Sequence, residues 1–316
     1  MNILVTGGCG YVGTALTHRL IEDGHSVRVI DTQWFGNHLK PHDRLEVIKA
    51  DIRDLSEGHF EGISTVIHLA NIANDPSVDL SPVLSWNVNV LAAEQLASMA
   101  RRQGVRQIIF ASSGSVYGLN DAEKVTENLP LVPISVYNKT KMVAERVFLS
   151  FAADMKIHIV RPATVCGLSD RMRFDLSVNM LTYQALENGQ IRVFGGKQVR
   201  PNIHIHDLVD VYCHFLSNRD LDTGCYNAGF ENLSILQIAE MAKEASDAEI
   251  VIVQSNDPRS YRQNSDKLLA TGFEPKFGVK DAISDLCMAY REQKLRAKPQ
   301  DYTVNWMKQL QLNEAS

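Results

Sequence analysis

The first half of the chain alternates short apolar, β-branched runs with longer segments in which apolar residues recur every three to four positions. This alternation predicts parallel strands joined by helical crossovers. The predicted strands cover residues 3–6, 26–30, 47–50, 65–69, 107–111 and 157–160, and the long predicted helices cover 11–23, 87–103 and 136–153. The order of these elements predicts a Rossmann-type, doubly wound parallel sheet of the α/β class.

The regular alternation ends near Gly167, and the following elements are shorter and mixed. A strand near 202–205 and a helix over 207–216 are expected to return to the first domain. The polar residues 294–316 have scattered apolar positions that predict no placement. The domains that this pattern predicts are a nucleotide-binding domain over 1–166, with a returning segment at about 202–218, and a smaller substrate-binding lobe over 167–201 and 219–316.

The charge balance of the 316-residue chain is mildly acidic, with a formal charge of −5 and a pI near 6.1. It predicts neither nucleic acid nor a membrane surface as a partner. The first residues read as a strand running into a turn, and no apolar run is long enough to span a bilayer. Five scattered cysteines without a CxxC pair are typical of free thiols in a reducing compartment. The expected location is the cytoplasm.

A glycine-rich turn follows the first predicted strand. Gly7, Gly10 and Gly13 let the backbone turn sharply and approach a pyrophosphate closely. Tyr11 and Val12 begin the next helix, where free backbone N–H groups and the positive end of the helix dipole favour an anion. The position of the turn between a strand and a helix predicts a dinucleotide site.

Asp31 ends the second strand, 18 residues after Gly13. A carboxylate at this position accepts hydrogen bonds from the adenosine ribose and repels a 2′-phosphate. No arginine adjoins Asp31, so NAD is the expected cofactor in preference to NADP. Asp51 is a candidate for the adenine edge, although capping a short helix explains it nearly as well. The remaining expected cofactor contacts are Ile52, after the third strand, and Leu69 and Ala70, at the end of the fourth.

A candidate catalytic set lies on the next strand and helix. Tyr137 and Lys141 stand four residues apart on a predicted helix and therefore share one face. An ammonium near a phenol favours the phenolate, and such a phenol exchanges a proton with a sugar hydroxyl while hydride moves. Ser113 follows the fifth strand, at the edge where open α/β sheets bind ligands.

Several motifs together support a family resemblance. They are the glycine turn, Asp31, Ser112-Ser113-x-x-Val116-Tyr117-Gly118, Tyr137-x-x-x-Lys141, Arg161-Pro162, the segment 200–207 and Asp257-x-Arg259-x-Tyr261. With these motifs, about residues 1–290 resemble the extended short-chain dehydrogenase/reductase family, in its nucleotide-sugar epimerase/dehydratase branch.

The resemblance implies that Tyr137 is the acid/base and that Lys141 tunes it and contacts the cofactor ribose. It implies that Ser113 hydrogen-bonds the reacting sugar oxygen and that Asn87 lies near the cofactor. The substrate would be a nucleotide-diphosphate sugar. The residues that the resemblance places at this substrate are Asn179, for the diphosphate, and Arg200 and Arg259, for the nucleotide or its phosphates.

Two departures from the family patterns disfavour two activities, that of a 4,6-dehydratase and that of a standard UDP-galactose 4-epimerase. The 4,6-dehydratases carry Thr-Asp-Glu where this chain has Ser113-Gly114-Ser115, so the acids that eliminate water are absent. Residues 161–167 also differ from the Arg-Tyr-Phe-Asn run of galactose 4-epimerases.

His204, His206 and Asp207 show no third ligand group, so we interpret them as structural and expect no metal.

Three functions fit these residues. The first is an NAD-dependent nucleotide-sugar epimerase, in which hydride passes to bound NAD and returns to the other face of the sugar. The second is an NAD(P)H-dependent reductase of a nucleotide-linked 4-keto-6-deoxy sugar, which Asp31 disfavours. The third is a non-catalytic dinucleotide-binding sensor, and the presence of both Tyr137 and Lys141 argues against it. Surface-polysaccharide precursors are the associated products of the family.

The two long helices match those that pair between subunits in this family, so a homodimer is expected. The apolar side chains expected at that contact are Leu91, Leu96, Val143, Val147 and Leu149.

Overall fold

A seven-stranded sheet forms the centre of the first domain in the computed structural model, which describes residues 1–119, 122–255 and 260–311. The strand order is β10-β6-β5-β4-β1-β2-β3, and neighbouring strands run parallel. Its strands are β1 (Asn2–Thr6), β2 (Ser26–Asp31), β3 (Leu45–Lys49), β4 (Thr65–His68), β5 (Gln107–Ala111), β6 (Lys156–Pro162) and β10 (Gly224–Ala228). The predicted α/β class and parallel sheet are confirmed.

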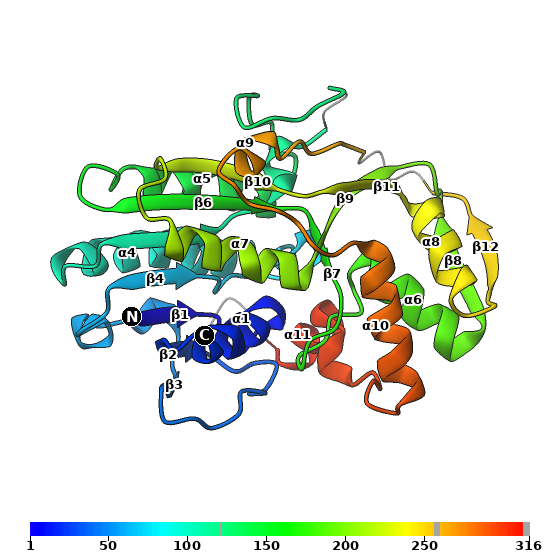
Figure 1. The fold of residues 1–316 in the computed structure, drawn as a ribbon, viewed down its shortest axis with the longest axis horizontal. Helices are drawn as coiled ribbons and strands as arrows, with labels where there is room; N and C mark the ends of the chain where they lie inside the picture. The colour runs from blue at the N-terminus through cyan, green and yellow to red at the C-terminus, as the bar shows by residue number, and fades with distance from the viewer. Residues whose placement is uncertain (120–121, 256–259, 312–316) are drawn as a thin grey trace.

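Helices cover both faces of this sheet (Figure 1). They are α1 (Tyr11–Glu22) and α7 (Ile205–Ser217) on one face, and α4 (Ala92–Arg102) and α5 (Val136–Leu149) on the other. Ile3 and Val5 join the apolar cluster under the first pair, whereas Leu4 joins the cluster under the second. Successive side chains of a strand point to opposite faces. Burial on both faces therefore explains the continuous apolar run of β1.

Two boundaries of the first domain differ from the prediction. The expected helix over 87–103 is continuous with α3 (Pro82–Trp86) and passes through a π-helical turn, Asn87–Leu91, before α4. Residues 219–316 were expected in the smaller lobe, but β10 within them forms the edge strand of the large sheet, parallel to β6. The chain therefore crosses back to the first domain once more than its pattern of apolar residues indicated.

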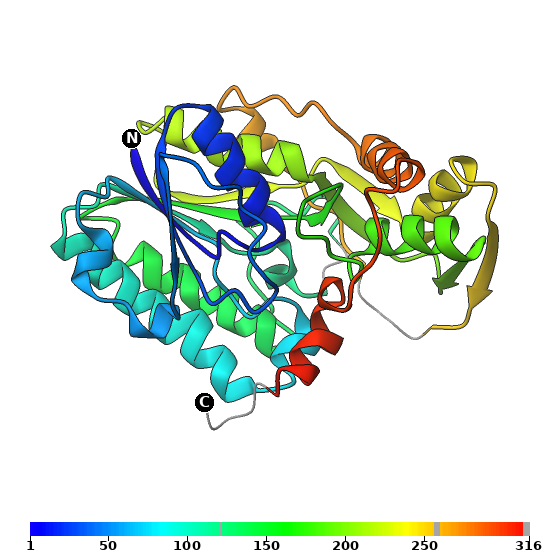
Figure 2. The same ribbon diagram turned by 90° about the horizontal axis from the view of Figure 1, so that it is seen from below.

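The smaller lobe combines two short sheets with three helices (Figures 1 and 2). Its strands are β7 (Thr164–Cys166), β9 (Val199–His204) and β11 (Glu231–Ser234) in one sheet, and β8 (Gln190–Phe194) and β12 (Glu249–Val253) in the other. Its helices are α6 (Ser177–Asn188), α8 (Ile235–Glu244) and α10 (Val279–Arg291), which share one apolar cluster. The strand expected near 202–205 thus belongs to the small lobe as part of β9, and α7 alone of the expected returning segment packs on the first domain.

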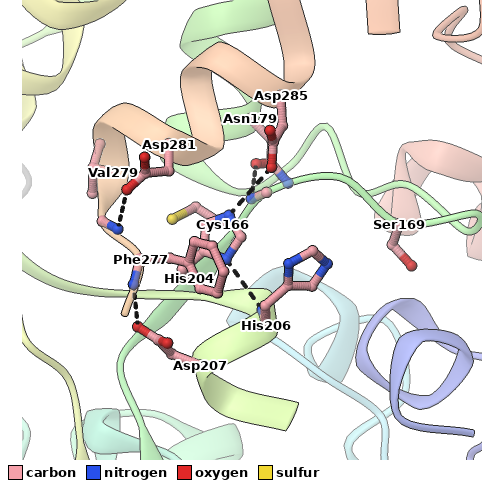
Figure 3. A network of polar contacts seen from close by, with 12 residues as sticks. Cys166, Ser169, Asn179, His204, His206, Asp207, Phe277, Val279, Asp281 and Asp285 are labelled. Carbon is pink, nitrogen blue, oxygen red and sulfur yellow. Dashed lines mark hydrogen bonds and ion pairs between the residues drawn. The ribbon is translucent and has the colours of Figure 1, made fainter. Parts of the chain in front are cut away.

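A polar junction connects α7 to the chain around α10 (Figure 3). The carboxylate of Asp207 accepts the backbone N–H groups of Lys276 and Phe277 at 2.9 and 3.1 Å. His204 accepts the N–H of His206 at 3.2 Å, and its Nε2 lies 3.7 Å from Asp285. These contacts give His204 and Asp207 the structural role that the sequence suggested.

Candidate active site

A cavity of about 600 Å³ opens where the carboxyl ends of the central strands face the small lobe. Gly7 after β1, Asp31 at the end of β2, Leu69 after β4 and Ser113 after β5 all line it. The chain adds β2 and β3 on one side of β1 and β4, β5 and β6 on the other, so the order of the parallel strands switches between β1 and β4. Ligands of open α/β sheets bind at such a switch point. The volume falls within the range of small-molecule sites.

The glycine turn leaves no room for side chains. Gly7 has a φ of 76°, in the left-handed region that favours glycine. A Cβ on Gly13 would lie 2.2 Å from the carbonyl oxygen of Gly7, so α1 packs directly on the turn. Gly10 provides no side-chain cap for α1, so the first backbone N–H groups of the helix, including those of Tyr11 and Val12, face the cavity wall without a capping side chain. This arrangement suits a pyrophosphate.

The other expected cofactor residues surround one end of the cavity, which we call the adenosine end. Asp31 accepts the N–H groups of Cys9 and Gln33 at 3.0 and 2.7 Å. Burial raises the pKa of Asp31, while these two amides act in the opposite direction. The carboxylate is thereby fixed, with further lone pairs left for ribose hydroxyls. The expected residues that line this end together with Asp31 are Asp51, Ile52, Leu69 and Ala70.

Asp51 also has the alternative role considered for it. Its Oδ1 accepts the backbone N–H of Arg53 at 2.8 Å and so caps the short helix Ile52–Asp54. The carboxylate also pairs with the Arg53 guanidinium at 3.0 Å. Asp51 is therefore a helix cap, and it also lines the cavity.

Ser113, Tyr137 and Lys141 meet at the cavity, where β5 ends beside the start of α5. Ser113 hydrogen-bonds the phenol of Tyr137. Burial raises the pKa of Tyr137 to about 12, whereas the Ser113 hydrogen bond and the charge of Arg173 lower it. The two groups that favour the phenolate are therefore Ser113 and Arg173.

Lys141 is 3% exposed, and its Nζ donates to the carbonyl oxygen of Ala111 at 2.6 Å. Burial lowers the pKa of Lys141 to about 7, and Glu145 opposes this shift. The tuning of Tyr137 by Lys141 stays a prediction.

A chain of hydrogen bonds connects Ser113 to Asn138. Asn138 Nδ2 donates to Ser115 Oγ at 2.8 Å, and the hydroxyls of Ser115 and Ser113 share a hydrogen bond of 2.8 Å in which either oxygen can be the donor. Ser113 Oγ also accepts the N–H of Ser115 at 3.2 Å. When Ser115 donates to Ser113, the Ser113 proton is available to the oxygen of Tyr137 or of a substrate.

Of the residues that the family resemblance places at the cofactor or substrate, Arg200 lines the cavity and Asn87 does not. Asn87 does not line the cavity, whereas Asn89, two positions on, is buried and holds the backbone of Ile72 at 2.8 Å. The π-helical turn at this point explains the shift, because it changes which side chains face inward. Arg200 lines the cavity and donates to the carbonyl oxygen of Val199 at 3.2 Å. Arg259 lies outside the described residues.

Asn179 is fully buried and does not line the cavity. Its Oδ1 accepts the N–H of Gly167 at 3.0 Å, and its Nδ2 donates to the Tyr11 hydroxyl and the Arg173 carbonyl, both at 3.1 Å. The expected contact to a substrate diphosphate is therefore corrected: this side chain joins α6 to the glycine turn.

Sequence reasoning missed a cationic part of the site between β7 and α6. Arg171 and Arg173 line the cavity, and Arg173 forms two hydrogen bonds with Asp175, at 3.1 and 2.6 Å. Arg171 stacks on Phe35 at 4.2 Å. The alternation Arg-Met-Arg-Phe-Asp, with buried Met172 and Phe174 between the charges, was the available signal.

Comparison with known proteins agrees with this geometry. The model of the NAD dependent epimerase/dehydratase family matches residues 3–229. UDP-glucose 4-epimerase of Corynebacterium glutamicum is 29% identical over 295 residues, 84% of this chain and 88% of that protein. UDP-glucuronic acid decarboxylase 1 of Xenopus tropicalis is 26% identical over 309 residues, 92% of this chain and 72% of that protein. MoeE5, solved in complex with UDP-glucuronic acid and NAD, has a TM-score of 0.84 at 27% identity, over 93% of this chain and 100% of that one.

The chain belongs to the NAD dependent epimerase/dehydratase family. It is an enzyme of the extended short-chain dehydrogenase/reductase type, and its cofactor is NAD, as the sequence predicted. The residues present fit that cofactor: the glycine turn would hold the pyrophosphate, and Asp31 would hold the adenosine ribose.

Proposed function

We propose that this enzyme is a nucleotide-sugar epimerase that inverts one hydroxyl-bearing carbon of its substrate. The observation that supports this most is the meeting of Ser113 and Tyr137 beside the cofactor cavity, with Gly114 and Ser115 where the dehydratase pattern has Asp and Glu. Removal and return of hydride needs one acid/base group, whereas elimination of water needs further acids. Epimerase relatives of this chain agree with the proposal.

In the proposed mechanism Tyr137 takes the proton of a sugar hydroxyl while hydride leaves the same carbon. Bound NAD supplies the acceptor of that hydride and then its donor. Ser113 donates to the sugar oxygen and holds it next to Tyr137 through the carbonyl stage. The sugar then turns over, hydride returns to its opposite face, and Tyr137 gives the proton back.

The phenolate form of Tyr137 is favoured by Ser113 and by the nearby charge of Arg173. Arg173 in turn is held by Asp175, whose carboxylate also accepts from Asn74 at 2.9 Å. The loop before α6 therefore contributes to catalysis through electrostatics, and the same loop faces the nucleotide sugar. Arg200, which also lines the cavity, is the proposed contact to the nucleotide or its phosphates.

The test is an incubation of purified enzyme with UDP-, GDP-, CDP- and dTDP-sugars without added reductant. The proposal predicts a stereoisomer of equal mass, resolved by chromatography and NMR, and its loss in Tyr137→Phe. A product lighter by water or carbon dioxide would establish a dehydratase or a decarboxylase instead. Oxidation of added NADH or NADPH only when a keto sugar is supplied would establish the reductase.

We also propose a homodimer through the exposed side of α3, the π-helical turn and α5. Val83 and Leu91 are 54% and 57% exposed there, whereas Leu96 is fully buried and does not contribute to the contact as expected. Val143 and Val147 are half-buried on α5. Light scattering at micromolar concentration should give twice the chain mass, and a monomer would contradict the proposal.

No helix among the described residues is long and apolar enough to cross a bilayer.

A further inference from the structure

The segment after α10 leaves the small lobe and returns to the first domain, beside α2 (Asp75–Val78) (Figure 2). It contains a short 3₁₀ helix, Pro299–Asp301, and α11 (Thr303–Gln309). Its sequence gave no basis for placing it. Three of its residues, Thr303, Val304 and Met307, line the same cavity as the glycine turn and Asp31.

Two polar contacts hold α11 and the short helix before it in place. The indole N–H of Trp306 donates to the carbonyl oxygen of Trp34 at 2.6 Å. Before the helix, the carbonyl oxygen of Asp301 accepts the N–H of Phe174 at 3.0 Å. One bond ties the segment to the loop after β2, and the other ties it to the loop before α6. The segment therefore bridges the two lobes across the cavity.

Apolar packing places α11 at the adenosine end. Met307 is 4% exposed and belongs to one cluster with Ile52 and Ile72, together with Trp34 and Phe35 at its edge. Ile52 borders the cavity beside Asp51, where the adenine is expected. The side chain of Met307 is thus in van der Waals contact with the wall that an adenine would complete.

Thr303 connects α11 to a buried cation. The hydroxyl of Thr303, which is 4% exposed, accepts from Arg171 Nη2 at 3.3 Å. Arg171 is 3% exposed, and burial lowers its pKa to about 10. Its Nε is buried and has no hydrogen-bond partner among the described residues. A buried guanidinium with a free N–H is a donor prepared for an anionic ligand.

We propose that α11 is a structural part of the cofactor site, and that it walls the adenosine end so that NAD stays bound between turnovers. The nicotinamide end must remain open to the sugar, so the opposite end is where retention can be built without blocking substrate. Met307 supplies apolar contact to the adenosine, Trp306 holds the helix closed, and Thr303 orients Arg171. The inference rests on the NAD site and is independent of which sugar reaction follows.

The experiment measures NAD on the full chain purified with its cofactor. Variants are Trp306→Phe, which removes the indole N–H and keeps an aromatic ring, and Met307→Ala. The matched control is Met288→Ala, on α10, where Met288 is 55% exposed and does not line the cavity. NAD per chain is determined after gel filtration by acid release, and the rate of release by transfer to an excess of a scavenging dehydrogenase.

The proposal predicts that wild type and Met288→Ala retain the cofactor equally. Trp306→Phe should release NAD about 3- to 10-fold faster, as expected for one lost hydrogen bond. Met307→Ala should release it about 10-fold faster or more, because a buried side chain against the ligand is removed. Release at the wild-type rate in both folded variants would overturn the proposal.

A second measurement needs no variant. Hydrogen exchange of the amides of α11 should slow when NAD is added to the cofactor-free wild-type chain, because bound cofactor stabilises the helix that covers it. Equal exchange with and without NAD would contradict the proposal. Neither measurement involves a sugar, so failure here would leave the epimerase proposal standing, and the reverse is also true.

Discussion

Replacing Lys141 by Met should make the cofactor-free protein more stable. Lys141 is 3% exposed, and burial lowers its pKa from 10.5 to about 7. At neutral pH, folding therefore requires the chain to desolvate an ammonium or to release its proton. Methionine has a similar length and makes neither demand.

The size of the effect follows from the two pKa values. At about 1.36 kcal/mol per pH unit, the depression from 10.5 to about 7 corresponds to a cost of about 5 kcal/mol at or below pH 7. Methionine also leaves the Ala111 carbonyl oxygen without its donor, which costs about 1–3 kcal/mol. The net gain in the free energy of unfolding is thus about 2–4 kcal/mol at pH 7.

The sign of the pH dependence is fixed by linkage. Because the folded pKa lies below the unfolded one, the unfolded chain holds the extra proton between pH 7 and 10.5. The contribution of Lys141 to stability is therefore greatest above pH 10.5 and is lost as pH falls toward 7. The advantage of Lys141→Met should shrink steadily as pH rises from 7 to 10.

The assay is urea unfolding of cofactor-free protein at several pH values and constant ionic strength. Lys139→Met, at an exposed position on the same helix, is the matched control and should change stability by less than about 0.5 kcal/mol. A Lys141→Met protein less stable than wild type at pH 7, or a stability difference independent of pH, would refute this reasoning.

Three further substitutions test the site. Ser113→Ala should lower the rate of sugar conversion about 10- to 100-fold and move the pH profile of that rate to higher pH, because a hydrogen bond that lowers the pKa of Tyr137 is lost. An unchanged pH profile would contradict the role assigned to Ser113. Asn138→Ala should move the pH profile in the same direction with a smaller loss of rate, about 3- to 10-fold, since Asn138 acts through Ser115 and Ser113. A change in KM alone would disprove that chain of hydrogen bonds. Gly13→Ala should abolish NAD binding or folding, as judged by calorimetry and circular dichroism, because its Cβ would lie 2.2 Å from the Gly7 oxygen; tight binding by the variant would show the turn to be adaptable.

The central sheet and the glycine turn could be predicted because both depend on local signals. Fully buried parallel strands give continuous apolar runs, and the turn after β1 needs glycines at fixed spacing. The convergence of Ser113 and Tyr137 could be predicted for a related reason. Carboxyl ends of parallel strands meet at one edge of the sheet, whatever the rest of the fold does.

The features that were missed depend on contacts distant in the sequence. The role of Asn179 is set by Tyr11 and Gly167, and nothing local in α6 indicates them. The placement of α11 is set by Trp34 and by the loop that holds Arg171. The edge position of β10 was missed because a short strand with mixed polarity has no distinctive periodicity.

The most direct test of the epimerase proposal follows the hydride itself. The nucleotide sugar that the enzyme converts is deuterated at the inverted carbon and converted without added cofactor. The proposal predicts that the product stereoisomer retains the deuterium at that carbon, as measured by mass spectrometry and NMR. Loss of deuterium to solvent, or conversion only when NADH or NADPH is supplied and consumed, would contradict an internal hydride cycle.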